Sequence, residues 1–220
     1  MLQVKNLSKV YQKNGQDVKA IDNVTLNLVD GDFVSLIGPS GSGKSSLLLM
    51  LGGMLTPSLG KVLLEGNSLY DLSSEERSSI RQNKIGFLFQ TFNLIPYLSA
   101  LENVQVPLLL SGLKPKEQID KATHLIEKVG LHDRMHHNPS ELSVGQQQRI
   151  ALARMLANDP QLILADEPTG NLDPEMSQTV MNFLLDLNSQ GKTILLVTHD
   201  MHVASQAKRT LQISKGGTLV

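Results

Sequence analysis

The sequence predicts an α/β fold: a parallel sheet with crossover helices, an antiparallel β subdomain at the N-terminal end and an inserted helical subdomain. Three observations predict it. Residues 2–28 carry short alternating apolar runs that meet at Asn14-Gly15, which is typical of two strands and a turn. Strand-like and helix-like segments alternate elsewhere, as in parallel sheets. Residues 91–157 instead read as mostly helical.

Each element has a local reason. Residues 33–38 form a β-branched apolar run that enters a glycine-rich turn, and a helix follows over 45–55 until Pro57 stops it. Residues 85–89 read as another buried strand. Capping and stop signals then place helices from Ser99, over 115–129 and from near 145 to 157. The remaining alternation predicts a strand at 162–165, a helix at 174–187 and a strand at 194–197.

Composition limits the possible functions. The 220 residues are 40% apolar, which is enough for an ordinary core, and 20 basic against 21 acidic residues leave a net charge of -1. Such a balance gives no general attraction to nucleic acid, so no nucleic-acid partner is expected. There are no cysteines, which excludes disulfides and thiolate metal sites. The most apolar stretch, 47–55, is about half the roughly 20 residues that span a bilayer. A cytoplasmic protein is expected.

A glycine-rich motif follows the strand at 33–37 and matches the pattern GxxxxGK[ST]. Its glycines allow successive backbone N–H groups to point at one centre, at the start of a helix, where they bind phosphate. The lysine adds a positive charge, and the last hydroxyl can ligate Mg²⁺. A chance match in this composition is expected only roughly 0.01 times. The predicted nucleotide-binding residues are Gly38, Pro39, Ser40, Gly41, Ser42, Gly43, Lys44 and Ser45, with Ser46 next to them.

Two carboxylates end the strand at 162–165. Asp166 and Glu167 would lie at the carboxyl edge of a parallel sheet, where ligands bind, with Asp166 on Mg²⁺ and Glu167 polarising the attacking water. Taken alone, the pair is as compatible with a solvated strand end. His199 and Gln90, which also end strands, are ambiguous alone.

The order of a larger set of motifs removes that ambiguity. Residues 142–149, Leu-Ser-Val-Gly-Gln-Gln-Gln-Arg, resemble the signature motif of ATP-binding cassette (ABC) proteins. The rest of that family's set follows in the family's order, over essentially the whole chain. Its members here are Tyr11 for the adenine-stacking aromatic, Gln90 for the Mg²⁺-sensing glutamine, Asp166 and Glu167 for the Walker B pair, Asn171-Leu172-Asp173 for the dimer-contacting loop and His199 for the switch histidine.

The resemblance implies a P-loop NTPase fold in one domain, with residues 1–90 and 158–220 as core and β subdomain and 91–157 as helical subdomain. It implies an ATPase that uses ATP and Mg²⁺, with the metal at Ser45, Gln90 and Asp166. It also implies catalysis by Glu167, His199 and Lys44. The dimer that it implies sandwiches two nucleotides, each facing the other subunit's Ser143, Val144, Gly145 and Gln146, with Asp173 at the interface.

One residue departs from the family pattern. Glycine usually stands where this chain has Val144. A β-branched side chain beside the partner's γ-phosphate restricts backbone freedom and close approach. A working but slower site is expected, since Ser143 and Gly145 are retained.

The sequences of two segments, 86–104 and 165–173, resemble those of one branch of the family: the lipoprotein-release, macrolide-export and cell-division ATPases. An integral membrane permease is therefore expected as partner, docking near Gln90–Leu101, with this chain on the cytoplasmic face of the inner membrane. Amino-acid importer ATPases share part of the sequence of the first segment. The apolar residues there either bind a permease helix or fill the helical subdomain's own core; they are Phe92, Leu94, Ile95, Leu98 and Leu101.

Other functions fit the sequence less well. Soluble ABC proteins of DNA repair or translation usually carry two cassettes or a long coiled-coil or basic insertion, and this chain shows none of these. A GTPase needs an Asn-Lys-x-Asp loop, which is also absent from this sequence. A kinase would give no reason for residues 142–149. Four histidines could suggest a metal site, yet no carboxylate pattern or cysteine completes one, so a solvated linker is the better interpretation. They are His132, His136, His137 and His202.

Overall fold

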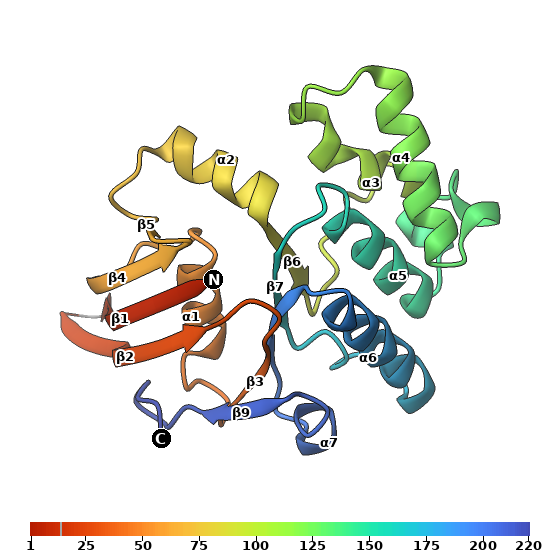
Figure 1. The fold of residues 1–220 in the computed structure, drawn as a ribbon. Helices are drawn as coiled ribbons and strands as arrows, with labels where there is room; N and C mark the ends of the chain where they lie inside the picture. Colours follow the sequence, from red (N-terminus) through yellow and green to blue (C-terminus); the bar gives the residue numbers. More distant parts are fainter. Residues whose placement is uncertain (14) are drawn as a thin grey trace.

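Two sheets and a cluster of helices make up the computed structural model, which describes residues 1–13 and 15–220 (Figure 1). The predicted Asn14-Gly15 turn lies in part outside the described residues, because Asn14 is not among them. Gly15 has a left-handed φ of 75°. In the described part of the chain, no helix combines the length and apolar character needed to span a membrane.

The N-terminal strands form an antiparallel sheet in the order β2-β1-β4-β5. Its two long strands are β1 (Leu2–Lys13) and β2 (Gln16–Leu28), as the sequence pattern predicts. The shorter β4 (Leu59–Leu64) and β5 (Asn67–Ser68) were not predicted. β4 joins the sheet by pairing with β1, Leu2 opposite Leu64.

The second sheet is parallel throughout and has the order β6-β7-β8-β3-β9. It confirms the predicted parallel sheet. Its strands are β3 (Phe33–Ile37), β6 (Ile85–Phe89), β7 (Leu162–Asp166), β8 (Thr193–Val197) and β9 (Arg209–Gln212). Because carboxyl ends of parallel strands share one edge, the residues that follow β3, β6, β7 and β8 meet there.

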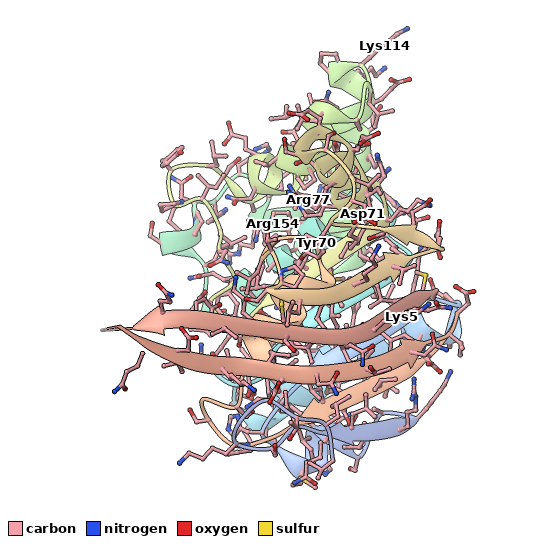
Figure 2. All side chains as sticks on the ribbon, turned by 90° about the vertical axis from the view of Figure 1, so that its left-hand side faces the viewer. Lys5, Tyr70, Asp71, Arg77, Lys114 and Arg154 are labelled. Atoms are coloured by element: carbon pink, nitrogen blue, oxygen red, sulfur yellow. The ribbon has the colours of Figure 1, made fainter. Side chains whose placement is uncertain are left out.

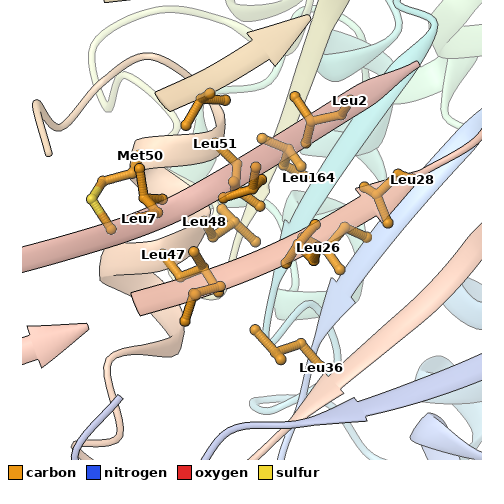
Figure 3. Packing of buried hydrophobic residues seen from close by; sticks show 14 of the residues in the cluster. Leu2, Leu7, Leu26, Leu28, Leu36, Leu47, Leu48, Met50, Leu51 and Leu164 are labelled. Carbon is orange, nitrogen blue, oxygen red and sulfur yellow. The ribbon is translucent and has the colours of Figure 1, made fainter. Parts of the chain in front are cut away.

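Helix α1 (Lys44–Leu51) lies between the two sheets. Its leucines pack with residues of β1, β2 and one face of the parallel sheet in the first core (Figure 3). The helix ends four residues before the predicted Leu55, because Gly52 and Gly53 stop it. Gly53 is left-handed (φ 70°), and a Cβ on Gly52 would lie 1.9 Å from a ring carbon of Phe87.

The other face of the parallel sheet carries the second core. Helices α5 (Val144–Met155), α6 (Pro174–Ser189) and α7 (Met201–Ala204) supply side chains to it. Helix α2 (Ser74–Lys84), which has no buried residue, leads into β6 and was not predicted.

The segment between β6 and β7 is mostly helical and has a third core. Helices α3 (Ala100–Gln105) and α4 (Pro115–Lys128) pack there with α5, and three short 3₁₀ turns connect them, η1 (Val106–Leu110), η2 (His132–Arg134) and η3 (Pro139–Glu141). Lys114, which caps α4, stands at the outer tip of this segment (Figure 2). Helix α5 contributes to both the second and the third core, so it connects the helical segment to the parallel sheet.

Candidate nucleotide site

The carboxyl edge of the parallel sheet opens into a cleft of about 640 Å³. Three of its lining residues, Gln90, Glu167 and His199, follow β6, β7 and β8. The phosphate-loop motif supplies most of the rest. The complete lining is Ala20, Gly38, Pro39, Ser40, Gly41, Ser42, Gly43, Lys44, Ser45, Ser46, Gln90, Glu167 and His199. The structure thus brings together nearly all residues predicted for phosphate binding, although they come from four distant parts of the chain.

The loop between β3 and α1 depends on glycine at two positions. Gly43, the N-cap of α1, has φ 91°, and a Cβ there would lie 2.1 Å from the carbonyl oxygen of Ala20. Gly38 is equally confined, since its Cβ would lie 2.5 Å from the carbonyl oxygen of Ile213. These close approaches place the N-terminus of α1 against the cleft, where its N–H groups and positive dipole end favour an anion.

Lys44 is 8% exposed and lies inside this loop. Its Nζ donates to the carbonyl oxygens of Gly38 (2.8 Å) and Pro39 (3.1 Å). No carboxylate forms a salt bridge with it in the described part of the chain. The ammonium is therefore held inside the loop by backbone carbonyls and has no salt-bridge partner in the described residues, which leaves it available to an anionic phosphate.

Asp166 is the last residue of β7 and lies close to Ser45 and Lys44 of the loop. Burial raises the pKa of its carboxyl, and the neighbouring Glu167 adds to this rise, whereas Ser45 and Lys44 act in the opposite direction. Its Oδ1 is buried and has no hydrogen-bond partner among the described residues. A buried carboxylate oxygen without a partner is costly unless a cation or proton satisfies it. Carboxylate and hydroxyl oxygens are ligands that Mg²⁺ prefers, so Asp166 and Ser45 fit that ion.

Glu167 and His199 form a pair beside the loop. Glu167 is in the left-handed region (φ 47°), and its backbone N–H donates to the carbonyl of Val197 over 2.9 Å. Its Oε2 lies 2.9 Å from His199 Nδ1 and accepts a longer bond, 3.3 Å, from the His199 backbone N–H. The carboxylate side chain is 15% exposed, the imidazole 69%. A residue held in a disfavoured backbone conformation by neighbouring contacts is common at functional sites.

Gln90 lines the cleft directly after the last residue of β6. Its carbonyl oxygen accepts from Asn171 Nδ2 over 3.2 Å. Its side-chain Nε2 lies against Gly170, where an added Cβ would come within 3.1 Å. Gln90 is thus fixed to the turn that follows Glu167.

The signature residues are absent from the lining of this cleft. Ser143 is the N-cap of α5: its Oγ accepts from the Gln146 backbone N–H over 3.3 Å, while Gln146 Oε1 accepts from the Ser143 N–H over 2.9 Å. Val144, the first helical residue, is half exposed. The structure therefore presents this helix N-terminus on the surface, apart from the phosphate loop of the same chain.

Gly145 of the signature and Asp173 of the predicted dimer loop have internal contacts that the sequence did not reveal. A Cβ on Gly145 would lie 2.6 Å from Met176 Cε in helix α6. Asp173, predicted to contact a second subunit, is the N-cap of α6, and its Oδ1 accepts from the Met176 N–H over 3.0 Å. The two segments are thus packed together within one chain.

Tyr11 does not line the cleft, whereas Ala20 does, and sequence reasoning missed Ala20. Tyr11 lies on β1 opposite Val18, half exposed, with Lys9 Nζ 5.2 Å from its ring centroid. Among residues 1–13 and 15–220 no three His, Cys, Asp or Glu side chains group as a metal site.

The apolar residues after Gln90 mostly pack inward. Phe92 belongs to the second core, Leu94 packs against both the second and the third, and Leu101 packs against the third. Beside them lies a second groove of about 570 Å³, less polar than the cleft, with Met54 and Leu110 exposed on its walls. Its lining is Met54, Ser78, Arg81, Gln82, Ile85, Gly86, Phe87, Phe89, Val106, Pro107, Leu110, Arg154, Met155, Asn158 and Pro160.

Comparison with known proteins identifies the class of protein. The ABC transporter family matches residues 21–170, so the chain belongs to that family. It is 43% identical over 216 residues to an uncharacterized ABC transporter ATP-binding protein of Thermotoga maritima, covering 98% of this chain and 92% of that one. It is 42% identical to the macrolide export ATP-binding/permease protein MacB of Hyphomonas neptunium, but spans only 34% of MacB's length.

Solved structures agree. The ABC cassette MJ0796, from Methanocaldococcus jannaschii, superimposes with a TM-score of 0.93 at 42% identity, covering 100% of this chain and 96% of that one. One of its structures is dimeric, and another is a dimeric post-hydrolysis state bound to ADP and Pi. The fold predicted from the sequence is confirmed.

Proposed function

We propose that this chain is the ATP-binding and ATP-hydrolysing subunit of a membrane transporter. One observation carries the proposal: the phosphate loop, Gln90, Glu167 and His199 converge on one cleft, while the signature N-terminus of α5 is exposed elsewhere. A single chain thus has an incomplete site and a spare anion-binding helix end, which two copies would bring together.

Glu167 is proposed as general base. Its carboxylate takes a proton from a water molecule while the water oxygen attacks the γ-phosphorus, and the bond from that phosphorus to the β-phosphate oxygen breaks, which leaves ADP and phosphate. His199 orients the carboxylate through the 2.9 Å contact and contacts the γ-phosphate. Lys44 and the loop N–H groups hold the phosphates.

Ser45, Gln90 and Asp166 are proposed to hold Mg²⁺, which when bound neutralises charge on the phosphate oxygens. The buried, unpartnered Oδ1 of Asp166 supports this assignment. Tyr11 is proposed to stack on adenine from its half-exposed position near the end of β1.

A homodimer is proposed as the active form. Ser143, Val144, Gly145 and Gln146 of one copy would face the nucleotide bound by the other, with Asp173 at the interface. The dimeric structures of MJ0796 support this arrangement. We also propose that residues 91–157 act as a helical subdomain on a core formed by residues 1–90 and 158–220.

The partner is proposed to be an integral membrane permease of the export or mechanotransmission type, as the likeness to MacB supports. Its cytoplasmic helix would dock near Gln90–Leu101, in the adjoining apolar groove. Arg81 and Arg154 line that groove, and no carboxylate among the described residues does. The chain would then lie on the cytoplasmic face of the inner membrane. Leu110→Glu should abolish co-purification with the permease from detergent extract while leaving the isolated subunit's ATPase rate unchanged.

Replacing Glu167 by Gln tests the function directly. The amide cannot accept the proton, so turnover should be lost, yet ATP should still bind and hold two copies together. Size-exclusion chromatography with ATP should show a dimer, and the variant without nucleotide a monomer. A variant that still hydrolyses ATP at the wild-type rate would disprove the assignment of the base, and one that stays monomeric with ATP would disprove the sandwich.

A further inference from the structure

A corner of the backbone directly after Gln90 is held in a conformation that its residues disfavour. Phe92 and Asn93 both have left-handed φ values, 58° and 50°. Two successive non-glycine residues in this region are unusual, and surrounding contacts must hold them there. The corner is tied to β6 by a hydrogen bond from the Phe92 N–H to the carbonyl of Phe89, 3.2 Å long.

The contact that holds this corner comes from the signature helix. Arg154, on the last turn of α5, donates from Nη2 to the Phe92 carbonyl and from Nη1 to the Asn93 carbonyl, each over 2.6 Å. The planar guanidinium fork fits two adjacent acceptors in a way that the single ammonium of lysine does not.

Arg154 makes these bonds from a desolvated position. Burial lowers the pKa of its guanidinium, and no carboxylate in the described ranges forms a salt bridge with it. A partly buried cation whose partners are two backbone carbonyls favours keeping both, since losing them leaves its desolvated N–H groups without acceptors.

Helix α5 carries this contact to the other end of the site. Ser143 caps its N-terminus, and Arg154 follows eleven residues later, about 16 Å along a rigid helix. The corner that Arg154 holds begins two residues after Gln90, whose amide lies against Gly170 beside Glu167. Arg154 thus links the helix that begins at the signature to the corner that follows Gln90, within one chain.

We propose that Arg154 is a positioning residue that sets the Phe92–Asn93 corner on helix α5 and so holds Gln90 at the edge of the nucleotide cleft. The proposal rests on the ATPase function proposed above. A displacement of Gln90 would leave the phosphate loop intact, so ATP binding would persist while catalysis slows.

The test compares Arg154→Lys and Arg154→Gln with Arg134→Lys, an exposed arginine on η2, as control. For both Arg154 variants we expect about tenfold lower kcat, because small displacements of a catalytic group slow chemistry strongly, and an unchanged ATP dissociation constant. Both Arg154 variants should also need a higher Mg²⁺ concentration than the wild type to reach half of their maximal rate. The control should match the wild type.

A second substitution separates positioning from general damage. Asn93→Gly makes the left-handed conformation easy without Arg154, so adding it to Arg154→Lys should recover most of the lost kcat. A merely structural role of Arg154 would give no such rescue.

Amide hydrogen exchange measures how firmly the Phe92–Asn93 corner is held, and it does not depend on ATP hydrolysis. Residues 91–96 should exchange faster in Arg154→Lys than in the wild type, with β3 and α1 unchanged. Unaltered exchange in this segment, kcat within twofold of the wild type, or no rescue by Asn93→Gly would overturn the proposal. A wild-type protein that hydrolyses no ATP would instead count against the proposed function, while the exchange result would still decide the contact.

Discussion

Ser143 has two roles that one pair of substitutions separates. It caps α5, and it is proposed to face the nucleotide of a second copy. Ser143→Ala removes the cap, which typically costs about 0.5–2 kcal/mol of stability. The capping bond is long, 3.3 Å, and exposed, which favours the lower half of that range, about 0.5–1 kcal/mol. For a protein of this size the melting temperature should fall by about 1–4 °C.

Ser143→Asp keeps the cap and places a carboxylate at a helix N-terminus, which the helix dipole favours. Stability should therefore match or slightly exceed the wild type. A negative charge facing the partner's phosphates should nevertheless reduce the ATPase rate about 100-fold or more.

The chain provides a matched control. Ser73 caps α2 in a capping box of the same kind: its Oγ accepts from the Glu76 backbone N–H over 3.2 Å. It lies outside the lining of the nucleotide cleft. Ser73→Ala and Ser73→Asp should change melting temperature as the Ser143 variants do, without changing hydrolysis. Calorimetry and a phosphate-release assay measure the two effects. Wild-type hydrolysis by Ser143→Asp would refute the assignment of this surface to the partner's nucleotide.

Three further predictions concern the same site. Asp166→Asn should raise the melting temperature of the nucleotide-free protein at pH 7.5 while abolishing Mg²⁺-dependent hydrolysis. Because burial raises the folded-state pKa, the carboxyl loses stability progressively as pH rises from its unfolded-state pKa through its folded-state pKa. The gain from the asparagine should therefore vanish at acidic pH, and an equal gain at all pH values would contradict the prediction. Gly145→Ala should fold with little change in stability, because the flexible end of the Met176 side chain can move aside and alanine has the higher helix propensity. The variant should nevertheless hydrolyse ATP slowly. If adding Met176→Ala restored the rate, packing within the chain alone would explain the loss. Val144→Gly should hydrolyse ATP faster than the wild type, and an unchanged or lower rate would show that Val144 does not restrain the site.

Local motifs made much of the site predictable. Gly38–Ser46 is contiguous, and its composition alone indicates a phosphate loop. Gln90, Glu167 and His199 are far apart in sequence, yet each follows an apolar strand, and the geometry of parallel strands places them together.

Long-range contacts were beyond sequence reasoning. Ala20 enters the cleft because β2 approaches Gly43 across the fold, and Arg154 reaches a backbone corner about 60 residues away. Neither leaves a local pattern. Helix α2 buries no side chain and so lacks apolar periodicity, although its Ser73–Glu76 capping box is a readable start signal.

The continuation of an apolar pattern also misled the prediction of α1. Leucine and methionine extend to Leu55, but Gly52 and Gly53 end the helix at Leu51. The need for Gly52 becomes visible only in the structure, where Phe87 occupies the space a side chain would take.

The most direct test of shared sites mixes two inactive variants. Ser143→Arg blocks the surface that one copy offers its partner, and Glu167→Gln removes the base from its own site. In a mixed dimer, one site then combines an intact Glu167 with an intact Ser143. With random pairing, half the dimers are mixed and each has one working site of two, so the initial ATPase rate should reach about a quarter of the wild-type rate. A mixture no more active than the two variants measured separately would contradict a site divided between two copies.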